Sequence, residues 1–268
     1  MSEITFLGTA GGRMVVTSQL RKSGGMWLDL NDKNILLDPG PGCLMRSVEL
    51  GFRPGKLDCI VLSHKHIDHS NDINIMIEAM SGGSFRPRGV LIVPKDALEG
   101  DDPVVLKYVR SYIRNNIKIL EPGFKWSLDG VQIEVASTMT HADVEAYGLK
   151  FIFNGKTLGY ITDTKYFSGL AESFKGCDYL IVNMVRITHD ARFEHLIPED
   201  VIKVLRVAKP KVALLNHFGM QVVKAGPDVI AQRIEAATGV RTIAAADGMK
   251  FDFDSGKAVK EPTINSFV

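Results

Sequence analysis

A run of potential metal ligands occupies residues 64–69, where three histidines and one aspartate appear as His64, His66, Asp68 and His69. Imidazole nitrogens suit zinc, iron and manganese, and a carboxylate adds a hard oxygen ligand. Side chains two positions apart share one side of an extended backbone, so we expect His64 and His66 to point the same way. Asp68 and His69 should then turn toward a second point nearby. The chain holds 7 histidines, and the concentration of three of them here favours a metal site over a solvated polar loop.

Further candidate ligands stand where predicted strands end. The apolar residues 57–62 predict a buried strand that leads directly into the histidine run. His141, Asp163 and His217 each follow another strand-like segment, and Asp38 ends one. Loops at strand ends are where functional residues gather. A lone histidine after a strand is more often a hydrogen-bonded loop residue, so each position by itself is weak evidence.

The pattern His-x-His-x-Asp-His at residues 64–69 resembles the signature of the metallo-β-lactamase fold superfamily. Further pieces of the same pattern recur in order, so the resemblance covers nearly the whole chain. Leu7-Gly8-Thr9 matches the usual opening turn of that family, and Asp38 matches its first motif. There the aspartate is implied to hold the histidine loop in shape, because carboxylates behind metal ligands fix their orientation. A helix N-cap or turn aspartate is the alternative for Asp38.

The resemblance implies a pair of divalent metal ions, with zinc expected and manganese or iron as alternatives. The implied ligands of the first ion are His64, His66 and His141, and those of the second are Asp68, His69 and His217, with Asp163 bridging both. Such a pair holds a hydroxide that is a nucleophile at neutral pH. Asp68 would also orient that nucleophile. The residues themselves establish only their types and their positions at strand ends.

His195 is the candidate for a catalytic residue that is not a metal ligand. The segment Glu194-His195-Leu196-Ile197-Pro198, followed by Leu215-Asn216-His217-Phe218, is similar to the phosphodiesterase branches, which include ribonuclease Z and the cyclic phosphodiesterases of phosphonate breakdown. The implied role is a general acid for the leaving oxygen or a clamp on a phosphoryl oxygen. A surface histidine is the alternative, and His189 is interpreted in that way.

Two departures from the family pattern bear on the substrate. The histidine run continues into Ser70-Asn71-Asp72 rather than a glycine-led turn, which makes the rim of the site particular to this subgroup. Asp163 follows His141 by only twenty-two positions, which leaves no room for the long tRNA-gripping arm of typical ribonuclease Z. The expected substrate is therefore a small-molecule or short nucleotide phosphodiester rather than a long tRNA.

Other functions remain open at this level. Hydrolysis of a thioester or lactone would use the same ligands without needing His195, an iron-dependent redox enzyme would use them differently, and a metal-binding protein without catalysis would only hold the ions. Serine catalysis has no support because no Gly-x-Ser-x-Gly occurs. Cys43, Cys59 and Cys177 are widely spaced and lie outside the ligand-rich stretches, so we interpret them as buried small hydrophobes in a reducing compartment.

Composition limits the rest. With 268 residues, 45% hydrophobic and 24% charged, the chain is expected to form one domain over residues 1–268. A formal charge of +1 gives no overall attraction to nucleic acid or an anionic membrane. No apolar run approaches the ~20 residues of a membrane span, and the acidic start Met1-Ser2-Glu3-Ile4 does not resemble a signal peptide. We therefore expect a cytoplasmic protein, with a homo-oligomer left open.

Strand and helix patterns alternate along the chain and predict an α/β (α+β) fold, a four-layer α-β-β-α sandwich. The expected strands cover residues 3–8, 18–30, 33–38, 57–62, 89–94, 147–153, 157–162, 179–185, 211–215 and 240–244. Hairpins are expected over residues 125–137, with Asp129-Gly130 as the turn, and at the end of the chain. The expected helices cover residues 43–50, 72–80, 103–115, 170–174, 198–207 and 228–238.

Two segments each allow both a structural interpretation and a functional one. Residues 8–13 predict a tight turn near the mouth of the site, or a phosphate cradle that lacks the usual glycine spacing. The helix expected at 103–115 should place Tyr108 and other apolar residues toward the core. Its basic face, which includes Arg110 and Arg114, is interpreted as solvated surface, or as an anion-attracting wall beside the site.

Overall fold

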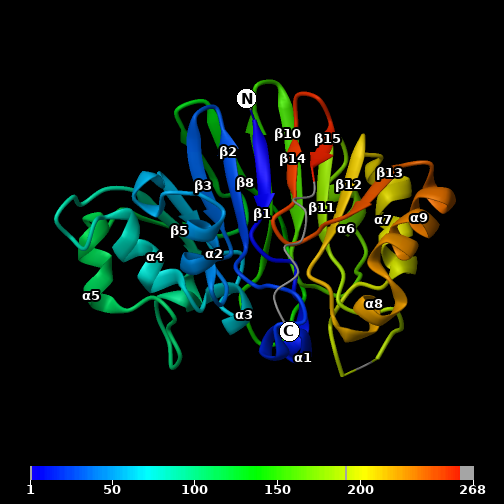
Figure 1. Cartoon of the computed structure of the whole chain (residues 1–268), viewed down its shortest axis with the longest axis horizontal. Helices are drawn as coiled ribbons and strands as arrows, with labels where there is room; N and C mark the ends of the chain where they lie inside the picture. Colours follow the sequence, from blue (N-terminus) through cyan, green and yellow to red (C-terminus); the bar gives the residue numbers. More distant parts are fainter. Residues whose placement is uncertain (1, 191, 260–268) are drawn as a thin grey trace.

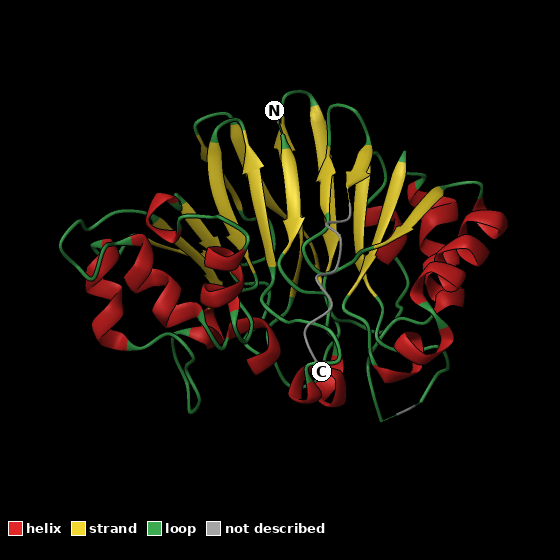
Figure 2. Ribbon diagram, viewed as in Figure 1, coloured by secondary structure: helices red, strands yellow, loops and turns green. Residues whose placement is uncertain are grey.

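Two β-sheets pack face to face and carry helices on both outer sides, as Figure 1 and Figure 2 show. The computed structural model describes residues 2–190 and 192–259. The first sheet has the order β15-β14-β1-β2-β3-β4-β5-β6. Its strands are β1 (Glu3–Phe6), β2 (Met26–Leu30), β3 (Lys33–Leu37), β4 (Cys59–Val61), β5 (Val90–Pro94), β6 (Ile117–Leu120), β14 (Lys250–Asp252) and β15 (Lys257–Val259).

The second sheet has the order β13-β12-β11-β10-β9-β8-β7. Its strands are β7 (Lys125–Leu128), β8 (Val131–Thr138), β9 (Tyr147–Phe153), β10 (Lys156–Ile161), β11 (Tyr179–Asn183), β12 (Val212–Asn216) and β13 (Arg241–Ala244). In each sheet a parallel block, β3 to β6 or β10 to β13, continues an antiparallel one. The carboxyl ends of parallel strands share one edge, and that edge is where ligands bind in open α/β sheets.

Helices cover the two outer faces, on the left and right of Figure 1. The helices of the first half are α1 (Gly12–Ser18), α2 (Cys43–Glu49), α3 (Ile67–Ser70), α4 (Ile73–Met80) and α5 (Lys107–Arg110), with 3-10 turns at Pro54–Lys56, Lys95–Ala97 and Ser111–Ile113. Those of the second half are α6 (Leu170–Ser173), α7 (Pro198–Ala208), α8 (Met220–Ala225) and α9 (Pro227–Thr238).

Three buried clusters correspond to the three interfaces between four layers. The largest lies between the sheets and includes Ile4 and Phe151. A second packs the helices of the second half on their sheet, and a third packs α2, α4 and α5 on the first sheet. This arrangement confirms the predicted α-β-β-α sandwich. All three cysteines are buried and free, as the sequence predicted.

The strand expected over residues 18–30 is wrong in its first half. Residues 12–18 form α1, which ends at Gln19 in the left-handed conformation (φ 51°). Gly24 and Gly25 also have positive φ, so the chain becomes a strand only at Met26. Backbone turns of this kind are local and carry no hydrophobic periodicity, which is why the pattern of residues 18–30 did not predict them.

The helix expected over residues 103–115 is wrong in length and in the placement of Tyr108, while Val105 and Val109 are buried as expected. Leu106 is extended and Arg114 is left-handed (φ 53°), so only one short α-helix and a 3-10 turn lie between them. Tyr108 is 57% exposed rather than buried. The guanidinium of Arg110 donates to the carbonyls of Leu98 and Val105 at 2.7 and 2.8 Å. Arg110 thus clamps its own segment, which favours the ordinary interpretation of the basic face.

The remaining expected elements lie within a few residues of the observed ones, while β6, α1, α3 and α8 had no counterpart among the expectations. None of the helices in the described ranges combines the length and the apolar character that crossing a lipid bilayer requires.

Candidate metal centre

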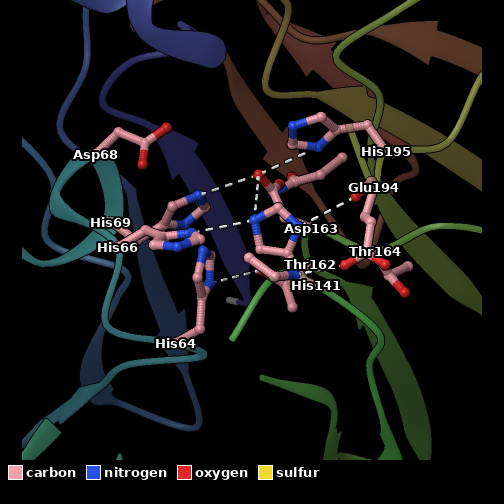
Figure 3. A network of polar contacts seen from close by, with 12 residues as sticks. His64, His66, Asp68, His69, His141, Thr162, Asp163, Thr164, Glu194 and His195 are labelled. Atoms are coloured by element: carbon pink, nitrogen blue, oxygen red, sulfur yellow. Dashed lines mark hydrogen bonds and ion pairs between the residues drawn. The ribbon is translucent and has the colours of Figure 1, made fainter. Parts of the chain in front are cut away.

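Five loops meet at the end of the sandwich where the parallel strands finish. Asp38 follows β3, the histidine run follows β4, and Asp163 follows β10 by two residues. His141 comes after β8, and His217 immediately follows β12. Figure 3 shows the histidine run approaching from one sheet while His141, Asp163 and His195 approach from the other. The centre therefore lies on the seam between the two sheets.

The glycine-rich segment 8–13 closes directly on one of these loops. The amide of Gly11 donates to Phe218 O at 3.0 Å, and the amide of Phe218 donates to Thr9 O at 2.8 Å. A Cβ on Gly11 would lie 2.2 Å from the carbonyl oxygen of His217. The segment therefore lies beside the site, where the predicted turn was placed, and its close approach to His217 requires glycine.

All seven predicted ligands converge, in three groups whose ligand atoms lie within 4.8 Å of one another. These groups are His64 with His66 and His141, His64 with His69 and Asp163, and Asp68 with His69 and His217. The sequence expectation paired the same residues in its first and last groups. His64, His69, His141, Asp163 and His217 are buried, while His66 and Asp68 are half-buried.

The distances between the ligand atoms fit shared cations. Nδ1 of His66 lies 3.0 Å from Nε2 of His141. Nε2 of His217 lies 3.3 Å from Nε2 of His69 and 3.4 Å from Oδ2 of Asp68. Two atoms that bind one tetrahedral zinc ion at its usual bond lengths are about 3.3 Å apart. The donor set therefore suits zinc or a similar divalent ion.

One oxygen of Asp163 faces both sides of this cluster. Its Oδ2 lies 3.3 Å from Nε2 of His217 and 3.8 Å from Nε2 of both His69 and His141. The same oxygen is 3.5 Å from Nδ1 of His195. Asp163 is thus placed between the first and the last ligand group.

Asp38 lies behind the histidine run, and its carboxylate contacts several of the groups around it. Its carboxylate accepts hydrogen bonds from the backbone amide of Ser63 at 2.6 Å, the Ser63 hydroxyl at 2.7 Å and the Tyr160 hydroxyl at 2.7 Å. Nδ1 of His69 lies 3.0 Å from Oδ2 of Asp38. Burial opposes charge on His69, but Asp68, Asp163 and Asp38 hold its pKa well above the usual range. With Nδ1–H donated to Asp38, loss of the Nε2 proton would leave that nitrogen's lone pair for an ion.

The imidazoles of His141 and His64 are oriented in the same manner. Nδ1 of His141 lies 3.1 Å from the carbonyl of Glu194, and Nδ1 of His64 lies 3.1 Å from the Ser63 hydroxyl. Nε2 of His64 is buried and has no hydrogen-bond partner among the residues that the structure describes. A buried ring nitrogen without a partner is costly, and a cation would satisfy it. This nitrogen is the clearest sign in the structure that the residues fit a metal.

The pKa shifts of the imidazoles run in opposite directions. Burial, reinforced by His69, holds the pKa of His64 well below its usual range, and burial with His141 lowers the pKa of His66. Burial opposes charge on His217 as well, but Asp163 beside it raises the pKa of His217 to about 9. Burial also opposes ionisation of Asp163, but the neighbouring His217 and His69 hold the pKa of its carboxyl well below the usual range.

His195 lies inside the cluster and His189 outside it. The ring of His195 is 5.0 Å from that of His141, and its side chain is 15% exposed. Burial lowers the pKa of His195 to about 4, although Asp163 opposes the shift. The side chain of His189 is 65% exposed and lies 3.3 Å from Asp200. The two histidines thus have the surroundings that the sequence analysis expected.

Sequence reasoning missed the polar groups behind the ligands. Tyr160 links Asp38 to the second sheet, and Asn183 donates to Oδ1 of Asp163 at 2.9 Å. The carboxylate of Glu194 accepts hydrogen bonds from the Ala142 amide and from Nζ of Lys165, the latter at 2.5 Å. The backbone carbonyl of the same residue contacts Nδ1 of His141. A polar residue at the end of the apolar strand β11 was the one available signal, since Asn183 interrupts a hydrophobic run.

Comparisons with known proteins agree with this geometry. The model of the Beta-lactamase superfamily domain matches residues 33–218. An uncharacterized protein of Methanocaldococcus jannaschii, MJ1374, is 32% identical over 260 residues, covering 95% of this chain and 96% of its own. Ribonuclease Z of Clostridium botulinum (strain Alaska E43) is 29% identical over 135 residues, covering 50% of this chain and 38% of its own.

A similar fold is known in three dimensions. The crystal structure of the metallo-beta-lactamase fold protein YhfI from Bacillus subtilis aligns with a TM-score of 0.74 at 20% identity. The alignment covers 93% of this chain and 98% of that one.

Proposed function

Because this chain belongs to the β-lactamase superfamily, we propose that it is a metal-dependent hydrolase that cleaves phosphodiesters. The observation that carries the phosphodiester assignment is the position of His195. Its Nδ1 lies 3.5 Å from the shared oxygen of Asp163, within the ligand cluster and yet outside the three ligand groups. A phosphodiester has two non-bridging oxygens, so His195 would bind the one that the ions leave free, whereas a thioester or lactone offers a single carbonyl oxygen.

The proposed centre holds two divalent ions, with zinc as the first choice. His64, His66 and His141 would bind one ion, while Asp68, His69 and His217 would bind the other, with Asp163 shared. When bound, such a pair lowers the pKa of a water to near neutrality and withdraws charge from a phosphoryl oxygen. The matched ligand spacings and the unpartnered Nε2 of His64 support this assignment.

His195 is proposed to clamp a phosphoryl oxygen through a neutral ring N–H. Burial lowers the pKa of His195 to about 4, and nearby cations lower it further. A group of that pKa is almost fully neutral at pH 7, which makes it a poor reservoir of protons for a leaving oxygen. A neutral imidazole still donates one hydrogen bond to the oxygen on which charge develops.

Asp68 is proposed to orient the attacking water. Its side chain is 21% exposed, more than those of Asp163, His69 and His217 beside it, so it faces the open side of the cluster. Burial disfavours charge on Asp68, but His69 and His217 hold the pKa of its carboxyl below the usual range. The ionised carboxylate accepts a hydrogen bond from the water and keeps a lone pair of that water directed at phosphorus.

The proposed substrate is a small diester or a short nucleotide. Five residues connect His141 to the start of β9 at Tyr147, and a two-residue turn, Asn154-Gly155, joins β9 to β10. No arm that could grip a long tRNA lies in this interval, all of which the structure describes. A compact rim supports access by small molecules.

The test is a direct comparison of substrates on metal-reconstituted protein. We expect turnover of bis(p-nitrophenyl) phosphate and little turnover of a chromogenic thioester or lactone. The His195→Ala variant should keep its bound metal and lose diesterase activity by about 100- to 1,000-fold, as loss of a charge-stabilising donor does. His189→Ala is the matched control, because that histidine is exposed and outside the cluster.

Each other outcome has a defined meaning. Preferred turnover of the thioester or lactone, with full activity of His195→Ala, would replace the phosphodiester assignment. A metal-loaded protein that hydrolyses no ester would be a binding protein. A coloured, iron-containing preparation without hydrolase activity would indicate redox chemistry.

A further inference from the structure

The buried amide of Asn183 stands directly behind Asp163, and we propose that Asn183 is a positioning residue that makes one oxygen of Asp163 available to both ions. The inference rests on the proposed pair of metal ions and adds a residue to it that is not itself a ligand. Asn183 is the last residue of β11 and is 3% exposed.

The two oxygens of Asp163 have separate surroundings. Oδ2 is the oxygen that faces the imidazoles of His69, His141, His195 and His217, at 3.3 to 3.8 Å. Oδ1 accepts a hydrogen bond from Nδ2 of Asn183 at 2.9 Å. The carboxylate is therefore held with one oxygen toward the cluster and the other toward β11.

This orientation needs an external cause. The terminal torsion of an aspartate is broad and roughly two-fold, so the side chain itself does not select which oxygen faces the cluster or at what angle. Without a donor behind it, Oδ1 would be a buried charged oxygen lacking a partner. Rotation that brings both oxygens toward one ion would relieve this cost, and the other ion would then lose its share of Asp163.

Asn183 is itself held from the opposite side of the site. Its Nδ2 also donates to the Tyr160 hydroxyl at 3.2 Å, and Tyr160 donates to Oδ2 of Asp38 at 2.7 Å. Burial, with Asp38 adding to it, raises the pKa of Tyr160, so the phenol remains a donor to Asp38. A chain of buried hydrogen bonds thus links Asp163 through Asn183 and Tyr160 to Asp38. Asp38 in turn orients His69.

Asn216 supplies a matched control. It pairs with Asn183 in register on the adjacent strand β12 and is 5% exposed. Its Nδ2 contacts Sδ of Met26 at 3.8 Å, and within the described part of the chain its Oδ1 has no hydrogen-bond partner. The same substitution at Asn216 therefore perturbs an equally buried strand end without removing a donor from Asp163.

The experiment measures stepwise metal affinity on chelator-treated protein. Asn183→Leu keeps the approximate size of the side chain, and Asn183→Val suits a strand; both lack a donor. Cobalt(II) is titrated against a competing chelator, and the visible spectrum follows each ion. We expect the first ion to bind nearly as in the unsubstituted chain and the second to bind 10–100-fold more weakly. Asn216→Leu and Asn216→Val should leave the ratio of the two affinities unchanged.

Two results distinguish failure of the dinuclear centre from failure of the role of Asn183. If the unsubstituted chain binds a single ion, the proposed dinuclear centre fails. If it binds two, and folded Asn183 variants show the same affinity ratio as the Asn216 variants, the role of Asn183 is overturned. A zinc-loaded crystal structure of either Asn183 variant gives an independent readout: Asp163 should be rotated, and an unrotated carboxylate would likewise reject the role.

Discussion

The imidazole of His69 and the carboxylate of Asp38 lie in contact across thirty-one residues of sequence, with Nδ1 3.0 Å from Oδ2. Both are buried, and the contact leaves the other ring nitrogen of His69 directed at Asp163 and His217. The orientation of a candidate ligand is thus set by a residue at the end of the neighbouring strand.

Asp38→Asn should weaken this arrangement without changing the size of the side chain. We expect metal affinity to fall 10–100-fold and the metal-free protein to lose about 1–3 kcal/mol of stability, because buried donors lose a charged acceptor. Metal content and thermal unfolding measure the two effects. Asp129→Asn is the control, since Asp129 is 74% exposed and pairs with Lys33, a contact worth about 0–1 kcal/mol. Equal effects of both variants would contradict the role of Asp38.

The two ions should be separable by substitution. His66 belongs only to the first ligand group and His217 only to the last. His66→Ala and His217→Ala are each expected to retain one ion per chain, while Asp163→Ala should weaken both. Elemental analysis after dialysis gives the stoichiometry. A His66→Ala protein that folds, binds two ions and turns over substrate at the normal rate would remove the basis of the scheme.

Metal binding should release protons at neutral pH. In chelator-treated protein, Asp163 raises the pKa of His217 to about 9 despite burial, so this imidazole is protonated at pH 7. A ligand must be deprotonated to bind an ion. His217 therefore contributes about one released proton at pH 7, a contribution that falls to zero as the pH rises through about 9. Calorimetry in buffers of different ionisation enthalpy measures the number released, and a value independent of pH between 7 and 10 would contradict the assignment.

The leaving group distinguishes a clamp from a general acid at position 195. Since the pKa of His195 is lowered to about 4, we expect His195→Ala to slow diesters with good and poor leaving groups by similar factors. A general acid would matter most for the poor leaving groups. Initial rates over a series of aryl diesters give the slope against leaving-group pKa. His195→Gln, which keeps a neutral donor, should recover part of the loss; a steeper slope for His195→Ala would restore the acid role.

Gly11 should tolerate no side chain. A Cβ there would meet the carbonyl oxygen of His217 at 2.2 Å, so Gly11→Ala must displace one of the predicted ligands. We expect a loss of about 1–3 kcal/mol together with weaker binding of the second ion. Gly55→Ala is the control, because the nearest atom to its Cβ is 3.6 Å away, an ordinary contact. Thermal unfolding and metal titration of the two variants test the difference.

The sequence predicted the candidate site better than it predicted the segments around it. His64 to His69 are contiguous, and the partners at 38, 141, 163 and 217 stand at strand ends, where a change from apolar to polar residues marks the position. Asn183 and Tyr160 carried weaker signals, because their roles depend on contacts 20 and 122 residues away in the chain. Side-chain hydrogen bonds between distant strands leave no periodic trace.

The errors in the fold have a local origin. The apolar spacing of residues 103–115 favours a helix, but an extended Leu106 and a left-handed Arg114 interrupt it. Helix α1 begins beside two glycines, which lower helix propensity, and it lies where the chain closes on His217. In both segments the backbone conformation of a few residues, which the apolar spacing does not encode, set the bounds of the elements.

The division of the ligands between the two sheets has a mechanical consequence. The histidine run follows a strand of the first sheet, whereas His141, Asp163 and His217 follow strands of the second. A bound ion would therefore cross-link the two sheets at one edge of the sandwich. Chelation should then speed amide hydrogen exchange at the ends of the strands that lead into the ligands, in both sheets. The apolar interior between the sheets, away from the metal centre, should keep its protection from exchange.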